Sequence, residues 1–310
     1  MKKGLSATTM RLMIPVVSLV VLLVAVFWLQ PRAMSYMGMN LLFNLAVPIA
    51  LATIAQMVII AVNDLDLSIG TFVSFAACVT AVYLPTDPLT GILILALAIG
   101  AYALMGVIIH LRDLPSIVVT LGMSFVWGGL AVLILPAPGG TAPVWLRALM
   151  TAATPVIPFA IIASIVIALV AHLIVMRSTF GVAIRGVGGN ARSVARAGWS
   201  VLKIKAMAYA LSGLFSVLAG MALVGLTPSA AANIALRYTL LSIAGVILGG
   251  GEFVGGRVSP LGAVVGALTL TLAGSFLSFL RISPDWQIGA QGAVLIIVLG
   301  LRLLLSRREA

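Results

Sequence analysis

The acidic residues best placed to take part in chemistry lie in the segment 63–70, Asn-Asp-Leu-Asp-Leu-Ser-Ile-Gly. This segment joins two apolar runs with almost no loop. Carboxylates this close to hydrocarbon are costly and often functional, so proton or cation handling is one interpretation. Capping is the other, because the free N–H groups and positive dipole of a new helix favour a nearby Asp66 or Ser68. No Lys, Arg or His stands near them in the sequence to complete a proton relay. We expect helix breaking and capping by Asp64, Asp66, Ser68 and Gly70.

The densest group of basic residues lies in the segment 177–205. Within it Asn190 is a good helix N-cap and Gly198 a good C′ residue, with room between them for about two helical turns. Arg192 and Arg196 are four residues apart and share one face, where unpaired like charges weaken an isolated helix. They fit a helix that docks into an acidic cleft of another protein, and a solvated basic loop is the alternative. The residues of this predicted docking helix are Asn190, Arg192, Ser193, Arg196 and Gly198.

A third segment, residues 249–260, is rich in glycine. It could suggest a phosphate-binding loop, but no strand is expected before it and no G-K-[ST] occurs in the chain, so both the Rossmann and the P-loop interpretations fail. A turn with several positive-φ positions is the simpler account. The chain therefore has no P-loop with which to hydrolyse ATP. The residues of this glycine loop are Gly249, Gly250, Gly255, Gly256 and Arg257.

Catalytic and metal-binding residues are not indicated. Cys78 is the only cysteine, which excludes an internal disulfide and a cysteine-based metal site. His110 and His172 are far apart, and the 7 acidic residues are spread over the chain. No nucleophile, base and orienting group come together, so we expect no catalytic set, no metal site and no cofactor bound by this chain.

The elements that must position these segments are apolar helices. The apolar share is 62% and charged residues are 8%, whereas a soluble domain carries about a quarter charged residues. Mean hydropathy is +1.25. Because the whole chain has this composition, it predicts an all-α polytopic membrane protein with a single transmembrane domain over residues 1–310.

The apolar runs divide into about ten membrane spans. Connections are short, apart from a Pro-, Gly- and Ala-rich segment at 136–155 and the basic segment at 177–205. The run 237–250 is short for a bilayer, so it is expected to extend into its flanks or to be a broken helix. The predicted spans are 13–29, 41–62, 68–84, 91–111, 114–135, 156–176, 205–226, 237–250, 260–280 and 285–303.

Basic residues set the orientation of these spans. When connections alternate between the two sides, 14 of the 18 basic residues fall on one side and 4 on the other. Because basic residues are retained in the cytoplasm, both termini, the docking helix and the glycine loop are expected on the cytoplasmic side of a bacterial inner (plasma) membrane. Orientation alone accounts for the net charge of +11, which makes nucleic acid a poor partner. Anionic lipid or an acidic cytoplasmic partner remains compatible with this charge.

Small residues recur every four positions in three spans. This spacing lets helix backbones approach closely in lipid, so it predicts packing within the chain or with a second copy. The residues are Ser212, Ser216 and Gly220, Gly245 and Gly249, and Gly262 and Gly266.

Polar and aromatic residues within spans are candidates for lining a substrate cavity. Interhelical hydrogen bonding is the alternative for each of them. The candidates are Asn44, Gln56, Thr120, Ser124 and Trp127.

The three segments together resemble the ribose-type permease subunits of bacterial ABC importers, close kin of the branched-chain amino-acid permeases. The family's GIDLS-(V/I)-G stretch corresponds to 63–70, and its G-x-N-x-x-(A/S)-A-x-x-(A/S)-G stretch to 188–198. Residues 209–220 are similar to Y-x-L-S-G-x-x-A-x-L-A-G, and residues 244–259 to A-x-V-x-L-G-G-x-x-x-x-G-G-R-G-S. The resemblance covers nearly the whole chain.

The chain departs from the family pattern at two places. Residues 62–65, Val-Asn-Asp-Leu, stand where the family usually has Gly-Ile, and residues 237–244, Arg-Tyr-Thr-Leu-Leu-Ser-Ile-Ala, replace an acidic E-L-D-A-I-A stretch. The second departure fits a permease that pairs with a different, paralogous permease.

The resemblance implies partner subunits and a separate role for each of them. An all-α permease of this type works as a dimer, with a second copy or a paralogous permease, an ABC ATPase subunit supplying two nucleotide-binding domains, and a periplasmic substrate-binding protein. ATP and Mg²⁺ are bound by the ATPase, whose movement reaches the permease through the docking helix. A monosaccharide is the implied substrate, and it would pass between the two permeases.

Other functions remain as alternatives. A nucleoside or amino-acid ABC permease is the alternative within the same kind of transport. An ion-coupled secondary transporter usually needs a charged residue in mid-span, and the predicted span centres hold none. An intramembrane enzyme is disfavoured because no cluster of His, Asp or Glu is expected at one depth.

Overall fold

The computed structural model describes residues 7–282, 286, 289, 292 and 293. This part of the chain contains α-helices, one 3₁₀ turn (η1) and one π turn (η2), and no β-strand. The elements in chain order are α1 (Ala7–Leu29), η1 (Pro31–Met34), α2 (Tyr36–Phe43), α3 (Ala46–Ala61), α4 (Ile69–Val82), α5 (Pro88–Leu111), α6 (Ser116–Ile134), α7 (Val144–Met150), α8 (Phe159–His172), η2 (Leu173–Arg177), α9 (Thr179–Arg196), α10 (Val201–Leu226), α11 (Tyr238–Leu248) and α12 (Pro260–Phe279).

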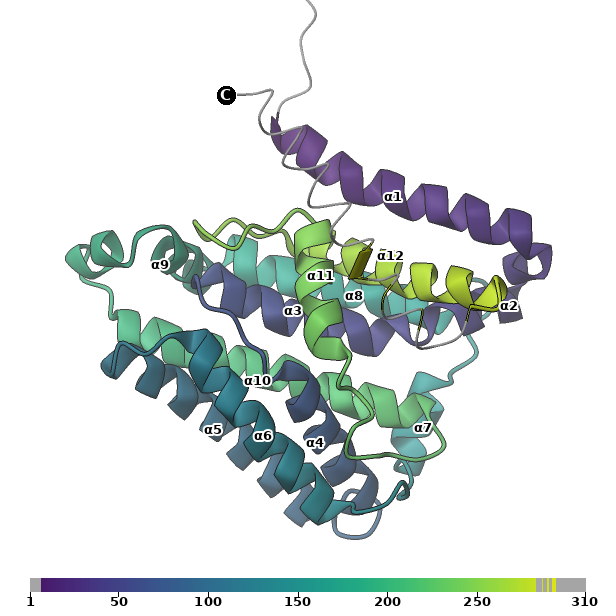
Figure 1. The fold of residues 1–310 in the computed structure, drawn as a ribbon, viewed down its shortest axis with the longest axis horizontal. Helices are drawn as coiled ribbons and strands as arrows, with labels where there is room; N and C mark the ends of the chain where they lie inside the picture. The colour runs from purple at the N-terminus through teal and green to yellow at the C-terminus, as the bar shows by residue number, and fades with distance from the viewer. Residues whose placement is uncertain (1–6, 283–285, 287–288, 290–291, 294–310) are drawn as a thin grey trace, which may run out of the picture.

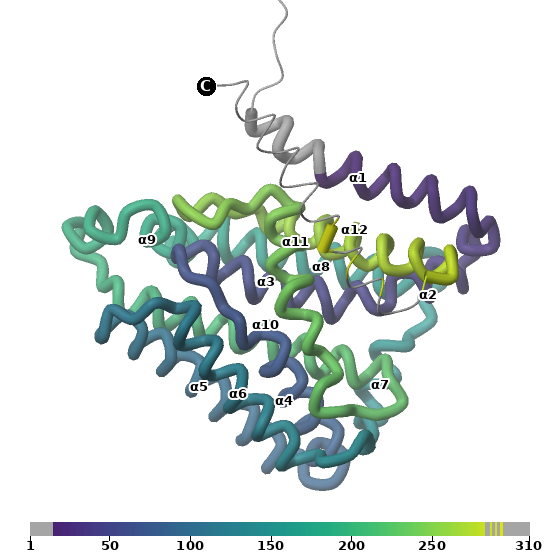
Figure 2. Tube along the Cα trace, in the orientation of Figure 1, coloured from purple at the N-terminus to yellow at the C-terminus, as the bar shows by residue number. Residues whose placement is uncertain are grey.

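The helices form one bundle with two distinct ends. Figure 1 shows α9 at one end of the long axis and α2 and α7 at the other. The connection from α3 to α4 leaves the end that carries α9, and α4 begins farther along the bundle, as the trace in Figure 2 shows. The segments predicted to be cytoplasmic, α9 and the glycine loop, lie side by side at the same end.

Six helical segments of the described chain are long and apolar enough to cross a membrane. The predicted number of about ten full spans is not supported by these residues. α4 has 14 residues and α11 has 11, which correspond to lengths of about 21 and 16 Å against a hydrocarbon core of about 30 Å. The predicted span 285–303 lies largely outside the described residues. The six segments are Tyr36–Ala61, Pro88–Leu111, Ser116–Ile134, Phe159–Arg177, Val201–Leu226 and Pro260–Phe279.

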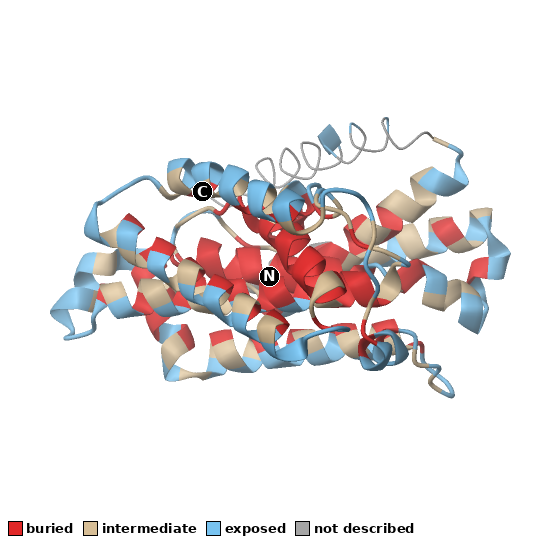
Figure 3. Ribbon diagram, turned by 90° about the horizontal axis from the view of Figure 1, so that it is seen from below, coloured by how far each residue is buried: buried red, intermediate tan, exposed pale blue. Residues whose placement is uncertain are grey.

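The centre of the bundle is α3. All of its 16 residues are buried, and Figure 3 shows the buried residues concentrated in the middle of the molecule with exposed residues around them. α10 packs against α3, α4 and α5. A helix that is apolar on every side, as α3 is, belongs in such an interior position.

The predicted close packing at small residues is confirmed within the chain. A Cβ added at Gly249 would lie 2.3 Å from the Gly262 carbonyl oxygen, and one at Gly266 would lie 2.2 Å from the Gly245 carbonyl oxygen. α11 therefore touches α12 backbone to backbone. A Cβ at Gly220 would lie 2.7 Å from the carbonyl oxygen of Val73, which places α10 equally close to α4.

The basic segment 177–205 is more helical than predicted. Residues 179–189, expected to be loop, form the first part of α9, because the Ser178 side chain caps its start by accepting from the N–H of Gly181. One face of this part is apolar and buried. The buried residues are Gly181, Ala183, Ile184, Val187 and Gly188.

Candidate functional site

The predicted docking helix is present as the second part of α9. The backbone leaves helical geometry at Asn190, whose side-chain oxygen accepts a hydrogen bond of 3.1 Å from the N–H of Ser193. At the other end Gly198 has φ +85°, and the N–H groups of Gly198 and Trp199 donate to the carbonyls of Ala195 and Val194. Both predicted caps are thus confirmed, the second as a Schellman motif. We call residues 190–198 the coupling segment.

The two arginines of the coupling segment face outward. Arg192 and Arg196 are exposed and form no ion pair with any described residue. Val194 lies on the other side, where its Cγ2 would be 3.1 Å from a Cβ added at Gly186, so the coupling segment folds back on the first part of α9. This arrangement presents unpaired positive charge to whatever lies beyond the end of the bundle.

The connection between α3 and α4 starts with a second Schellman motif. Asn63 has φ +64°, and the N–H groups of Asn63 and Asp64 donate to the carbonyls of Ile60 and Ile59. Asparagine tolerates this left-handed conformation better than most residues, which explains a non-glycine residue at this turn. The turn directs the acidic residues that follow back into the bundle.

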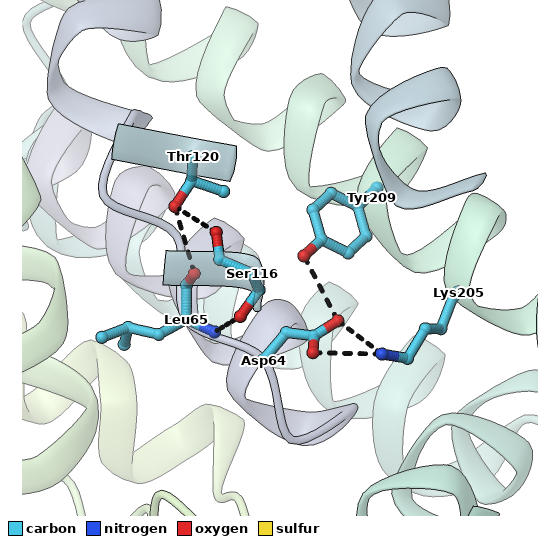
Figure 4. A network of polar contacts seen from close by, with 6 residues as sticks. All are labelled: Asp64, Leu65, Ser116, Thr120, Lys205 and Tyr209. Carbon is cyan, nitrogen blue, oxygen red and sulfur yellow. Dashed lines mark hydrogen bonds and ion pairs between the residues drawn. The ribbon is translucent and has the colours of Figure 1, made fainter. Parts of the chain in front are cut away.

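Asp64 forms an ion pair that the sequence did not suggest. The Lys205 ammonium donates to both carboxylate oxygens of Asp64, at 3.0 and 2.9 Å, and the Tyr209 hydroxyl donates to Oδ2 at 3.2 Å (Figure 4). The side chains of Lys205 and Asp64 are only 15% and 10% exposed, so water screens the pair weakly. The sequence showed no basic residue near Asp64, because its partner lies 141 residues away on α10.

The backbone after Asp64 is held by α6. The N–H of Leu65 donates to Ser116 Oγ at 3.1 Å, and the N–H of Leu67 donates to Thr120 Oγ1 at 3.0 Å. Thr120 in turn donates toward the carbonyl oxygens of Leu65 and Ser116, as Figure 4 shows. These contacts satisfy backbone groups that the buried, non-helical linker leaves without helical partners.

Asp66 is completely buried and does not cap α4 in the predicted way. Its Oδ1 accepts from both the N–H and the hydroxyl of Ser68, each at 2.7 Å, and its Oδ2 accepts from the Tyr102 hydroxyl at 2.8 Å. The Gln56 amide, oriented so that its nitrogen donates to the Asp66 carbonyl, also accepts from the Asp66 N–H. Asp66 therefore joins α3, α5 and the start of α4.

The free N–H groups of α4 find a partner on another helix. Ser68 occupies the N-cap position without a side-chain cap bond, and the Gly70 N–H donates to Thr239 Oγ1 of α11 at 3.0 Å. A Cβ at Gly70 would lie 2.7 Å from the carbonyl oxygen of Ala235, so only glycine allows this approach. The prediction that Asp66 or Ser68 caps the first turn of α4 is wrong for this N–H. Tertiary contact between two short helices supplies the cap instead.

The glycine loop packs against α9. Gly250, Gly255 and Gly256 have φ values of +89°, +90° and +65°, which confirms the prediction of positive-φ positions. A Cβ at Gly256 would lie 2.2 Å from the Arg185 carbonyl oxygen, and Gly249 belongs to the contact with α12 described above. Arg257 is exposed and lies 3.6 Å from Glu252. A cavity of about 560 Å³ opens between this loop and α9, with Arg185 and Arg257 on its wall.

The five predicted cavity residues are not gathered in one place. Gln56 and Thr120 are buried and hold the backbone of the α3–α4 connection. Trp127 is buried against Phe72, with ring centroids 4.7 Å apart. Ser124 donates to its own helix, and Asn44 is partly exposed at the end of α2. A role in a substrate cavity stays a prediction for all five.

Sequence reasoning missed the partners of the acidic pair. Lys205, Tyr209, Tyr102, Ser116 and Thr239 each contact the segment 63–70 from another helix. The only available signal was the pattern Lys205 and Tyr209, four residues apart at the start of α10, which places an ammonium and a phenol on one helical face.

The fold and this site define an all-α polytopic membrane protein of the permease type. The family model of the branched-chain amino acid transport system / permease component matches residues 38–299, and the chain belongs to this family. It is 27% identical to the probable ABC transporter permease protein y4mJ of Sinorhizobium fredii, covering 94% of this chain and 90% of that one. It is 26% identical to the galactose/methyl galactoside import permease protein MglC of Escherichia coli, covering 94% of each chain. It is 27% identical to the ribose import permease protein RbsC of Bacillus subtilis, covering 96% and 92%.

These relatives confirm the resemblance that the sequence motifs predicted. No solved structure matched the chain.

Proposed function

We propose that this chain is the permease subunit of a bacterial ATP-binding-cassette importer that translocates a monosaccharide. The similar proteins named as galactose/methyl galactoside and ribose import permeases support a sugar as substrate. The chain has no P-loop sequence, so the energy must come from a separate ATPase subunit that binds ATP and Mg²⁺. The chain itself is a transport subunit and not an enzyme.

The observation that carries this proposal is the coupling segment. It is capped at Asn190 and Gly198, rests on the bundle through Val194, and exposes Arg192 and Arg196 at one end of the molecule. Charge-assisted hydrogen bonds from arginine are well suited to carboxylates of a partner protein. We therefore place the ATPase against this end, with the glycine loop beside the contact.

The proposed assembly follows from the orientation of the basic residues. Both termini, the coupling segment and the glycine loop are cytoplasmic, the permease lies in the inner membrane, and residues 1–310 form one transmembrane domain. About ten crossings result if α1, the short α4 and α11, and the predicted span 285–303 are counted together with the six long apolar segments. A second permease, identical or paralogous, completes the pathway, and a periplasmic binding protein delivers the sugar. Anionic lipid contacts the basic cytoplasmic face.

A branched-chain amino acid is the second candidate substrate, because the description of the family names such a transport system. Uptake into cells that lack their own ribose and galactose systems distinguishes the two. We expect the chain, expressed with its ATPase and binding protein, to import labelled ribose or galactose. Import of leucine without import of either sugar would show that the substrate is an amino acid and not a sugar. Uptake that persists without the ATPase would contradict the proposal that the chain belongs to an ABC importer.

A further inference from the structure

Both flanks of the coupling segment contact the same short stretch at the end of α3. The flank before it is Gly188, two residues ahead of Asn190, and the flank after it contains Lys205, in the second turn of α10. Gly188 lies against Ala61, and Lys205 binds Asp64. A displacement of the coupling segment therefore reaches residues 61–64 by two routes.

The first route is a backbone contact. A Cβ at Gly188 would lie 2.2 Å from the carbonyl oxygen of Ala61 and 2.9 Å from the Cα of Gly256. No side chain separates α9, α3 and the glycine loop at this point. Because interiors packed at this density have low compressibility, the first part of α9 and the end of α3 must move together.

The second route depends on side chains. Between the helical part of the coupling segment, which ends at Arg196, and α10 lies the turn 197–200, in which Gly198 has φ +85° and carries no side chain. A turn of this kind can absorb a rotation without passing it on. The Lys205 ammonium, bound to both oxygens of Asp64, and Tyr209, one turn farther along α10, tie the start of α10 to the residue that follows the α3 turn.

The linker beyond Asp64 has little freedom of its own. Leu65 and Leu67 are hydrogen-bonded to α6, and Asp66 is bound by Ser68 and Tyr102. Each of these contacts is directional, so the linker favours a small number of arrangements over a continuous range. Movement at Asp64 is therefore passed to the start of α4, which begins inside the bundle.

We propose that Lys205 and Asp64 are a positioning pair that couples the movement of the coupling segment to the α3–α4 linker during transport. The proposal rests on the proposed function, since it requires an ATPase at the coupling segment. Its essential feature is that the pair is not needed to bind the ATPase, because Arg192 and Arg196 lie on the opposite side of the turn. Loss of the pair should separate ATP hydrolysis from transport while the complex stays assembled.

The test uses the full complex of permease, ATPase and binding protein in proteoliposomes, with ribose and galactose as probes. Lys205→Met removes the charge at similar length, and Lys203→Met is the matched control, because Lys203 lies on the same helix, is exposed and forms no ion pair with a described residue. The double variant Asp64→Asn/Lys205→Met replaces the pair by two neutral side chains, which avoids leaving one buried charge alone.

We expect the ATP hydrolysed per sugar imported to rise about fivefold or more in Lys205→Met and in the neutral double variant. The ATPase should co-purify normally, and Lys203→Met should match the wild type. A neutral double variant with wild-type coupling would overturn the proposal, and so would one that fails to accumulate, since the pair would then serve folding. If the wild-type complex shows no ATP-dependent uptake of either sugar, the proposed function fails instead.

Discussion

The hydroxyl group of Tyr102 on α5 donates a hydrogen bond of 2.8 Å to the buried carboxylate of Asp66, in the connection between α3 and α4. The same carboxylate accepts two bonds from Ser68, so three donors from two parts of the chain depend on one side chain. This arrangement explains why an acid is used deep in an apolar bundle: a carboxylate accepts at several positions at once. We expect a structural role for Asp66, in which the shape of the side chain matters as well as its charge.

Asp66→Asn should therefore keep most of the folded protein and much of the transport, because the amide oxygen still accepts from Ser68 and the Tyr102 hydroxyl can turn to accept from the amide nitrogen. Asp66→Leu leaves these buried donors unpaired, at a cost of about 1–3 kcal/mol each. The measurement is the amount of monodisperse protein after extraction, together with its melting temperature. Full-level expression of a completely inactive Asp66→Asn protein would instead favour proton or cation handling.

Thr120→Val should destabilise the protein, because it removes the acceptor of the Leu67 N–H while keeping the shape of the side chain. The expected loss is about 1–3 kcal/mol. Ser124→Ala, one turn farther along α6, is the control, since the Ser124 hydroxyl bonds only to the carbonyl of Leu121 in its own helix. Equal melting temperatures for the two variants would show that the linker does not depend on α6.

Two adjacent glycines of α9 should respond oppositely to alanine. At Gly188 the new Cβ would meet the Ala61 carbonyl oxygen at 2.2 Å, whereas at Gly189 its nearest neighbour is the Gly255 carbonyl oxygen at 3.6 Å. Gly188→Ala should lower the stability by about 1–3 kcal/mol through overpacking. Gly189→Ala should be neutral or raise it by less than about 1 kcal/mol, as alanine favours helix. Similar melting temperatures for both variants would refute the contact between α9 and α3.

Local contacts were the part of this site that the sequence could predict. Asn190 bonds to an N–H three residues away and Gly198 closes a single turn, so residue type alone indicates both caps. The contacts around the acidic segment span 36 residues between Asp66 and Tyr102, 141 between Asp64 and Lys205, and 169 between Gly70 and Thr239. Nothing in a single sequence pairs residues across such distances, because the folding of the bundle decides which helices meet.

The described residues hold six long apolar segments where about ten full spans were predicted, and the reason is helix length. The predicted runs 68–84 and 237–250 begin within one residue of α4 and α11, but the helices themselves have only 14 and 11 residues and are too short for full spans. α4 starts only after the buried turn at Asp66, and the Thr239 hydroxyl of α11 caps it. When only hydropathy is considered, each of these two short helices is counted as a full membrane span.

The predicted orientation can be tested by labelling single cysteines in a Cys78→Ser background. Ser193→Cys, in the coupling segment, should react with an impermeant thiol reagent only after the cells are opened. Trp145→Cys, exposed in the segment predicted to lie outside, should react in intact cells. Cys78 itself is buried, so its replacement removes only a weak background. Reaction of Ser193→Cys from outside would reverse the orientation.

The most direct test of the account is the double variant Arg192→Glu/Arg196→Glu, assayed by co-purification of the ATPase and by sugar uptake in membrane vesicles. Both side chains are exposed, so the bundle should stay folded while the reversed charge repels an acidic groove. Arg147→Glu/Arg237→Glu, two exposed arginines predicted to lie on the outer side, makes the same change of charge as a control. We predict loss of ATPase binding and of uptake in the first double variant only. Normal assembly and normal uptake in that variant would contradict the account and leave the coupling segment as a solvated basic loop.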